Sequence, residues 1–302
     1  MSDAAHHPRH IVVGIDGSRG ALNAAAWATE VAALHRVPLR MLFVHDPSEG
    51  GRRGGEAHHG GEHERQRAQD AHMHLTEAAE VARHVAASGP TRPGTTEIRM
   101  EMRAGTSFTT LLEAADAAEL LVLGARSDSS SAPASLVTTA ALIARSACPV
   151  AVVRPGFRRT GGSIVTGVRS DGEPDVLHYA FRHAQLSGTV LRAVHSVATG
   201  PNSSIPDPTA GSDEARDRLD AWLAPERGRF PEVVVDPITT EAPADEVLVR
   251  YSSSAELLIV GRGVPPAAPR GILGRTATGV LMHATCPVIF AGPHRRLRYA
   301  GK

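Results

Sequence analysis

One stretch in the first half of the chain is rich in histidine and glutamate, the residue types that could bind a divalent metal ion. Its members are His58, His59, Glu62, His63, Glu64, His72 and His74. Neutral imidazoles are common ligands of Zn²⁺ and Ni²⁺. Metal-binding tracts usually keep a fixed ligand spacing, whereas this stretch mixes expected loop with expected helix. A solvated loop is therefore the favoured interpretation, and no metal cofactor is expected.

A serine-rich segment is the other local feature with potential chemistry. Residues 127–131 read Ser-Asp-Ser-Ser-Ser. This composition is more typical of a loop than of a catalytic nucleophile, and phosphorylation is the alternative use. No nucleophile elbow, metal-ligand spacing or pair of carboxylates stands out. The sequence thus contains no positive sign of an enzyme.

Two similar segments indicate how the chain is organised. Residues 120–124 read Leu-Leu-Val-Leu-Gly, and residues 257–261 read Leu-Leu-Ile-Val-Gly. Each is followed by a helical stretch of small residues and then by Cys-Pro-Val, beginning at Cys148 and at Cys286. The two cysteines are 138 residues apart and the two closing glycines 137. A repeat of about this length indicates a duplicated domain, because solenoid repeats recur every 20–50 residues or so.

The first copy alternates apolar, β-branched runs with amphipathic runs, which predicts alternating strands and helices. The expected strands are residues 10–16, 39–44, 96–102, 120–123 and 150–153, and the expected helices are 21–35, 66–87, 106–117 and 135–146. A loop is expected over residues 45–64. Asp16 and Ser18 are the candidates to cap the first helix. We expect this first domain to span residues 1–154, with a linker at 155–162.

The second copy, expected over residues 163–302, repeats the same order. Its expected strands are 163–168, 190–195, 233–239, 257–260 and 288–291, and its expected helices are 176–186, 214–223, 244–253 and 275–283. Strands joined through helices pair in parallel by right-handed crossovers. The sequence therefore predicts an α/β fold of two tandem doubly wound domains, each an open five-stranded parallel sheet flanked by helices. A ligand site is expected at the carboxyl ends of the strands.

Composition excludes several classes of partner. The chain has 302 residues, with 32 basic and 32 acidic side chains and a formal net charge of zero. Such a balance gives no electrostatic attraction to nucleic acid or to anionic membranes. No run approaches the length of a membrane span, and residues 1–10 do not read as a signal peptide. We therefore expect a soluble cytoplasmic protein, with Cys148 and Cys286 as buried structural thiols.

Four segments carry a resemblance to a known family. They are Ile-Val-Val-Gly-Ile-Asp-Gly-Ser at 11–18, Ala-Glu-Leu-Leu-Val-Leu-Gly at 118–124, Ala-Cys-Pro-Val-Ala-Val-Val-Arg at 147–154 and Thr-Cys-Pro-Val-Ile-Phe-Ala at 285–291. In this order they resemble the universal stress protein family in its tandem form, over almost the whole chain. The resemblance implies a sheet of the adenine nucleotide alpha hydrolase type in each copy. It also raises the question of ATP, because some members of the family bind ATP and others do not.

In the first copy, the resemblance implies an incomplete ATP site. ATP-binding members have an Asp at the end of the first strand and a loop of pattern G-x2-G-x9-G-(S/T) after the fourth, whose glycines let backbone N–H groups approach the phosphates. The first copy keeps Asp16 and Gly124. Ser127 stands at the spacing of the second glycine. Leu136 and Val137 stand where the third glycine and the hydroxyl residue belong, which adds bulk at the phosphate position.

In the second copy, the resemblance implies a different partial site. Gly261 and Gly274 have the right separation, but Val264 replaces the middle glycine and Arg275 the hydroxyl residue. Arg169 stands where the Asp belongs.

Three interpretations of these partial sites are open. Both pockets have decayed, or the first copy retains ATP through Asp16, or the second copy still binds a nucleotide or another anion weakly. In the last case Gly261, Gly271 and Gly274 would supply backbone donors, and Arg262, Arg270 or Arg275 would supply positive charge. If a site survives, we expect it after the fourth strand of the second copy.

The ends of the second strands also match between the copies. Val44 and His45 correspond to Val194 and His195, and in the family they would border the adenine side of the pocket. For the two histidines, a polar residue at a strand end without ligand contact is the favoured alternative.

The leading hypothesis is a tandem universal stress protein, a stress-response regulatory or binding module with weak or absent ATP binding. The alternative is an ATP-binding switch with slow hydrolysis or phosphotransfer. The fifth strands, residues 150–153 and 288–291, are expected to pair within the chain, as the resemblance implies, which would remove two exposed sheet edges. The protein partner is unknown.

Overall fold

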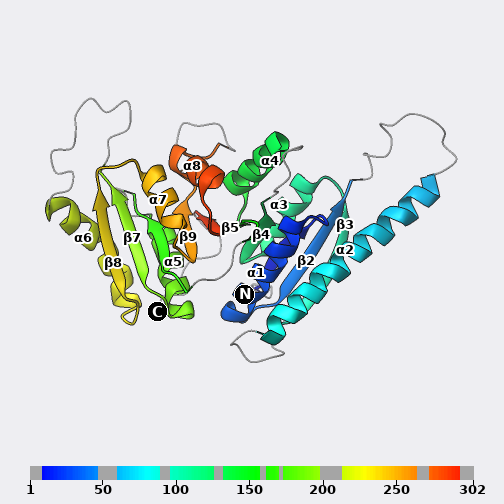
Figure 1. Ribbon diagram of the computed structural model, residues 1–302, viewed down its shortest axis with the longest axis horizontal. Helices are drawn as coiled ribbons and strands as arrows, with labels where there is room; N and C mark the ends of the chain where they lie inside the picture. Colours follow the sequence, from blue (N-terminus) through cyan, green and yellow to red (C-terminus); the bar gives the residue numbers. More distant parts are fainter. Residues whose placement is uncertain are drawn as a thin grey trace, which may run out of the picture. The chain divides into compact units, whose positions relative to one another are not determined.

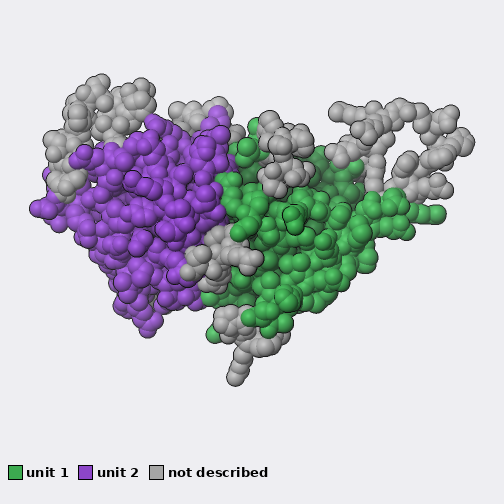
Figure 2. Space-filling view, in the orientation of Figure 1, with its two compact units in different colours: residues 1–156 green, residues 157–302 purple. Residues whose placement is uncertain are grey.

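The computed structural model of the protein (Figure 1) describes residues 9–46, 60–88, 96–125, 132–156, 161–169, 173–197, 213–263 and 272–292. The chain divides into two compact units, Met1–Gly156 and Phe157–Lys302, which Figure 2 distinguishes by colour. Within the described residues, each unit contains five strands and has its own buried core.

The first unit alternates strands and helices as the sequence predicts. Its elements are β1 (Ile11–Ile15), α1 (Arg19–His35), β2 (Leu39–His45), α2 (Gly60–Ser88), β3 (Ile98–Ala104), α3 (Ser107–Ala117), β4 (Leu120–Gly124), α4 (Ala132–Arg145) and β5 (Val150–Val153). The strand order is β3-β2-β1-β4-β5, with parallel pairing throughout. Helices α1 and α2 pack together on one side of this sheet, and α3 packs with α4.

The second unit repeats this architecture. Its elements are β6 (Ile164–Gly167), α5 (Pro174–Ser187), β7 (Leu191–Ser196), α6 (Asp213–Arg229), β8 (Val235–Thr240), α7 (Ala244–Ser252), β9 (Leu257–Gly261), α8 (Arg275–His283) and β10 (Val288–Ala291). The strand order is β10-β9-β6-β7-β8, again parallel. The predicted α/β fold of two doubly wound copies is confirmed.

The two similar apolar segments form the centre of each core. The four residues before Gly124 in β4 and the four before Gly261 in β9 are all buried. This is expected of strands in a parallel sheet that helices cover on both faces. Cys148 and Cys286, which precede the fifth strands, are both buried thiols, as predicted.

Two helices, α2 and α6, are each seven residues longer than predicted. Helix α2 begins at Gly60, inside the stretch expected to be a loop, because its polar first turns have no apolar periodicity to mark them. Helix α6 continues through Pro225 to Arg229 instead of ending near residue 223. The reason lies in tertiary contacts, since Glu226 beyond the proline is buried against His178 of α5 at 2.9 Å.

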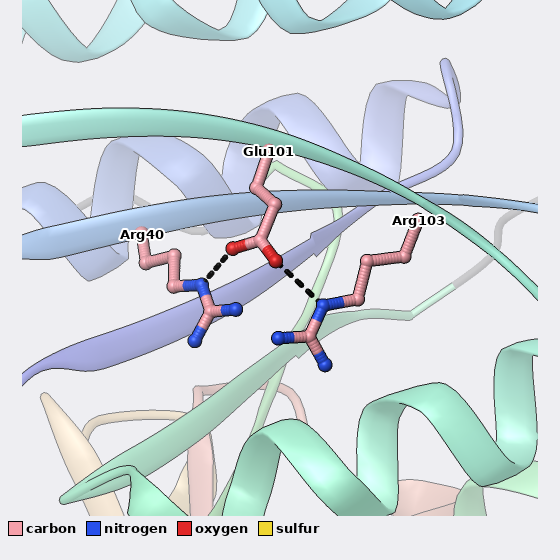
Figure 3. A network of polar contacts seen from close by, with 3 residues as sticks. All are labelled: Arg40, Glu101 and Arg103. Atoms are coloured by element: carbon pink, nitrogen blue, oxygen red, sulfur yellow. Dashed lines mark hydrogen bonds and ion pairs between the residues drawn. The ribbon is translucent and has the colours of Figure 1, made fainter.

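An ion network joins β2 and β3, the neighbouring strands at one edge of the first unit (Figure 3). The guanidinium of Arg40 in β2 donates from Nε to the Glu101 carboxylate of β3, and Arg103 donates to its other oxygen at 2.5 Å. The hydrogen bond from Arg40 lowers the pKa of Glu101 below its ordinary value of 4.5; partial burial opposes this and Arg103 reinforces it. The carboxylate therefore stays charged between its two cations.

Within the described ranges, no helix is both long and apolar enough to cross a membrane.

Candidate functional site

The strand order places a reversal between β1 and β4 in the first unit and between β6 and β9 in the second. β1 pairs with β2 on one side and with β4 on the other, in parallel register from Ile11↔Leu120. β6 pairs with β7 and with β9 in the same way, from Ile164↔Leu257. Open parallel sheets bind ligands at such a switch point, outside the carboxyl ends of the strands. The candidate sites are therefore the residues that follow these four strands.

In the first copy, the residues after β1 form the cap of α1. The Asp16 carboxylate accepts a hydrogen bond from the Ser18 backbone N–H at 3.0 Å. Ser18 is the N-cap, because its hydroxyl accepts from Ala21 N at 3.1 Å. Of the two predicted capping residues, Ser18 caps the helix, while Asp16 orders the turn and has an exposed side chain.

A histidine ring lies against the turn after β1. A β-carbon built on Gly17 would lie 2.5 to 2.7 Å from three ring atoms of His74, which comes from α2. The same ring stacks on Phe43 of β2, with centroids 6.1 Å apart and planes 17° apart. Its Nδ1 is buried and has no hydrogen-bond partner among the described residues. The chain's own imidazole thus fills the space beside Gly17, the residue after Asp16.

Gly124, which closes β4, packs directly on the first turn of α1. A β-carbon at Gly124 would overlap the backbone of Gly20 and lie 2.6 Å from Ala21 N. A β-carbon at Gly20 would in turn meet the backbone of Gly124 and Ala125. Both residues must be glycine for this approach of helix to strand. Packing alone therefore accounts for Gly124, without any ligand.

The corresponding turn in the second copy contains an ion pair. Arg169 follows β6, and its Nη1 lies 3.6 Å from the Oε1 atom of Glu173. Glu173 precedes the first residue of α5 and has a left-handed backbone, with φ 31° and ψ 71°. Its side chain does not cap the helix.

The Glu173 carboxylate lies on Gly261, the glycine that closes β9. A β-carbon built on Gly261 would come within 3.0 Å of both carboxylate oxygens. Sequence reasoning missed this residue. A signal was available, because Glu173 follows Arg169 by four residues just as Gly20 follows Asp16. The second copy therefore fills with a side chain the space that the first copy fills with backbone.

The two ends of the loop between β9 and α8 meet at a pair of glycines. Gly274 N donates to Arg262 O at 3.0 Å. A β-carbon at Gly274 would lie 3.0 Å from the Gly263 Cα, and Gly263 has φ +57°. Gly274 is also the N-cap of α8. Both glycines are thus required for closing the loop at its base.

Two of the three arginines proposed as compensating charges, Arg262 and Arg275, lie against other residues. Arg275 lies 3.6 Å from Asp245 of α7. The Arg262 side chain is buried against Gly292, where a β-carbon would lie 3.0 Å from its Cδ and Nε atoms. The guanidinium beside Gly263 is that of Arg169, whose Nη1 would lie 3.9 Å from a β-carbon there.

The ends of the second strands differ between the copies. His195 is buried, shares a hydrogen bond of 2.8 Å with Val168 O and meets the Trp222 ring edge-on at 4.9 Å. Val194 is buried as well, and its carbonyl accepts from Val168 N at 2.8 Å. Val44 and His45 of β2 are partly exposed. His195 is therefore a polar strand-end residue with structural partners.

Several predicted residues lie outside the described residues, namely Ser127, Val264, Arg270 and Gly271, together with His58 and His59. Of the histidine-rich stretch, the described side chains are His72 and His74, both on α2. Over the residues described, no group of three or more metal-ligating side chains comes together. Gly124, Gly261 and Gly274 are found at tight backbone contacts, and Asp16 at the turn after β1.

The chain matches the model of the universal stress protein family twice, over residues 7–154 and 162–291. It is 30% identical over 295 residues to the universal stress protein Rv2028c of Mycobacterium tuberculosis, which covers 95% of this chain and 98% of the relative. It is 31% identical over 262 residues to Rv3134c of the same organism, which covers 83% and 87% respectively. Among solved structures, a universal stress protein from Archaeoglobus fulgidus aligns over 95% of this chain and 97% of its own, with a TM-score of 0.69 and 15% identity. At this low identity, the likeness to the solved structure shows the fold alone.

Proposed function

Because the chain belongs to the universal stress protein family in its tandem form, we propose that it is a cytoplasmic stress-response regulatory module with weak or absent ATP binding. In this role the protein acts through binding and not through catalysis. Its nucleotide sites are degenerate in both copies, in different ways.

The contact between His74 and Gly17 carries this proposal. The imidazole stacks on Phe43 and lies against the turn that holds Asp16, so the space beside Gly17 in that turn is already filled. A ligand would have to displace a ring that packs against both an aromatic side chain and the backbone. Such displacement costs binding free energy, because the protein's own contacts must be broken first.

Calorimetric titration of the full chain with ATP tests the proposal. We expect no binding, or binding weaker than the micromolar range, and no nucleotide in the purified protein. The matched variant is His74→Ala, which removes the ring and keeps Asp16. A gain in ATP affinity in this variant would support self-occupation of the first copy, whereas micromolar binding by the unmodified chain would overturn the proposal.

An ATP-binding switch is the second candidate function. The base of the loop between β9 and α8 favours it, because neither Gly263 nor Gly274 has a side chain there and the Arg169 guanidinium borders Gly263. This function predicts slow release of phosphate from ATP by the purified chain. A rate equal to that of buffer would exclude hydrolysis.

The binding partner of the protein and the pairing of its fifth strands are the next part of the proposal. We infer that the module acts through a protein partner, and pairing of the fifth strands, β5 and β10, within one chain remains a prediction from the resemblance. The balanced charge of 32 basic and 32 acidic residues favours a protein surface over nucleic acid.

A further inference from the structure

An anionic group of the chain itself occupies the carboxyl end of β9. Both oxygens of Glu173 lie so close to Gly261 that a β-carbon there would come within 3.0 Å of them. The Glu173 side chain is only 19% exposed. No side chain separates the carboxylate from the glycine, so an incoming anion would meet a like charge at contact distance.

The surroundings of the carboxylate are suited to an anion. The Arg169 guanidinium lies 3.6 Å from it and also borders Gly263. Gly263 and Gly274 pack on each other at the base of the loop without side chains. A guanidinium is a favourable partner for a carboxylate or a phosphate. The site therefore has both a place for an anion and an occupant.

Local helix geometry does not explain why Glu173 is there. Its backbone is left-handed at φ 31°, which is unfavourable for a residue with a β-carbon. Its side chain makes no capping hydrogen bond to α5. The carboxylate lies against Gly261 and beside the Arg169 guanidinium. The carboxylate thus serves the site at the end of β9 and not the start of α5.

The equivalent position in the first copy is occupied by a glycine instead of a glutamate. There the backbone of Gly20 packs on Gly124 and leaves no space. In the second copy Glu173 takes the place of Gly20, four residues after the strand-end residue. Backbone packing cannot be removed without moving a helix, whereas a side chain can rotate away. A removable occupant makes the second copy the one whose access can be regulated.

We propose that Glu173 is an internal anion that blocks a phosphate position at the end of β9, with Arg169 as its counter-charge. This inference rests on the proposed function, in which the nucleotide sites of the two copies are degenerate in different ways. The ligand class is a chain of phosphoanhydride-linked phosphates, as in a nucleoside triphosphate or inorganic tripolyphosphate. When the carboxylate is neutralised or withdraws, Arg169 pairs with the phosphate instead.

Calorimetric titration of full-length Glu173→Gln with ATP and with sodium tripolyphosphate tests the proposal. Glutamine keeps the shape and removes the charge, so binding should tighten at least about tenfold relative to the unmodified chain. The matched control is Glu232→Gln, which makes the same charge change at an exposed turn before β8, at the amino edge of the sheet. Equal gains in affinity for the two ligands would show that the site recognises the phosphate chain. A gain for ATP alone would show that it recognises the nucleoside as well.

A second pair of variants keeps the test decisive. Glu173→Gly restores the residue of the first copy and suits the left-handed backbone, so it should fold and should also gain affinity. Adding Arg169→Gln to Glu173→Gln should abolish the gain. Backbone amide shifts of Gly261, Gly263 and Gly274 in ¹⁵N-glycine protein should respond to tripolyphosphate in Glu173→Gln and not in the control.

The possible failures are distinguishable. Unchanged affinity in folded Glu173→Gln and Glu173→Gly would overturn this inference and leave the proposed function standing. Micromolar ATP binding by the unmodified chain would overturn the proposed function, whatever the variants do.

Discussion

The space around single glycines decides what the carboxyl edge of each sheet can hold. Gly17 has φ +78° and has the His74 ring where its side chain would be. Gly188, after α5, has a similar φ of +65° but open space around the position of a β-carbon. The two positions separate backbone strain from steric overlap.

We expect Gly17→Ala to destabilise the protein by about 2 to 4 kcal/mol, because it adds overlap with His74 to the cost of a left-handed alanine, about 1 to 2 kcal/mol. Gly188→Ala should show only the second cost. Urea unfolding measures both. In a His74→Ala background the excess cost of Gly17→Ala should fall, and an equal cost in both backgrounds would contradict the contact.

Some residues at this edge were predictable and others were not. Ser18 was, since a hydroxyl just before an amphipathic run is a capping signal that needs no tertiary information. For Glu173, comparison of the two copies marks the position, but the contact with Gly261 depends on the distance between α5 and β9, which no local pattern encodes. His74 belongs to a histidine-rich stretch read as solvated, and its burial against Phe43 depends on how α2 lies on the sheet.

At the scale of elements, α6 shows how tertiary contacts override a helix breaker. Pro225 lies inside the helix, yet the chain continues to Arg229. Beyond the proline, Glu226 pairs with His178 at 2.9 Å and with Arg229 at 2.8 Å, and Phe230 packs on the His178 ring. The sequence marks the proline but not the partner on α5, so the predicted helix was too short.

Replacing His178 by phenylalanine should destabilise the second unit by about 1 to 3 kcal/mol, since a carboxylate that is 4% exposed loses one of its partners. The ring contact with Phe230 is kept. Chemical denaturation measures the change. His283→Phe, at an exposed position of α8, is the control and should shift stability by no more than about 0.5 kcal/mol. Equal effects would argue against the buried pair.

The ion network between β2 and β3 makes a prediction about acid stability. Arg40 is the main cause of the lowered pKa of Glu101 in the folded state. The charged carboxylate therefore stabilises the fold fully above the ordinary pKa of 4.5, and this stabilisation is lost as the pH falls through the folded pKa. Glu101→Gln should therefore be less stable than the unmodified chain at pH 7, and the difference should shrink below pH 4.5.

Glu97→Gln is the control for this pH dependence, because Glu97, just before β3, pairs with Arg99 of β3 but both side chains are more than half exposed. Its effect should be small at either pH. Urea midpoints at the two pH values give the comparison. A constant difference between Glu101→Gln and the unmodified chain would rule out the charge effect.

At the scale of the whole molecule, the architecture was the most predictable feature. The duplicated strand segments are apolar and buried on both faces, which specifies parallel strands covered by helices. The spacing of the repeat specifies two copies of this architecture. The predicted pairing of the fifth strands implies that the two units unfold together. Each unit contains one tryptophan, Trp27 in α1 and Trp222 in α6.

The single-tryptophan variants Trp222→Phe and Trp27→Phe test this coupling. If the fifth strands pair, fluorescence from either tryptophan should report the same denaturation midpoint, because loss of one unit withdraws contacts from the other. Circular dichroism provides the global control. Two separated midpoints would show that the units unfold independently and would contradict the pairing.

The contact between Gly20 and Gly124 also constrains how the two copies can diverge. Each glycine excludes a side chain at the other position, so no single substitution at either is tolerated without moving α1. At the equivalent place in the second copy, only Gly261 is restricted in this way, and residue 173 already has a side chain. Mutational drift after duplication can therefore change the occupant of the second copy one step at a time, while the first copy is held at its present pair of residues.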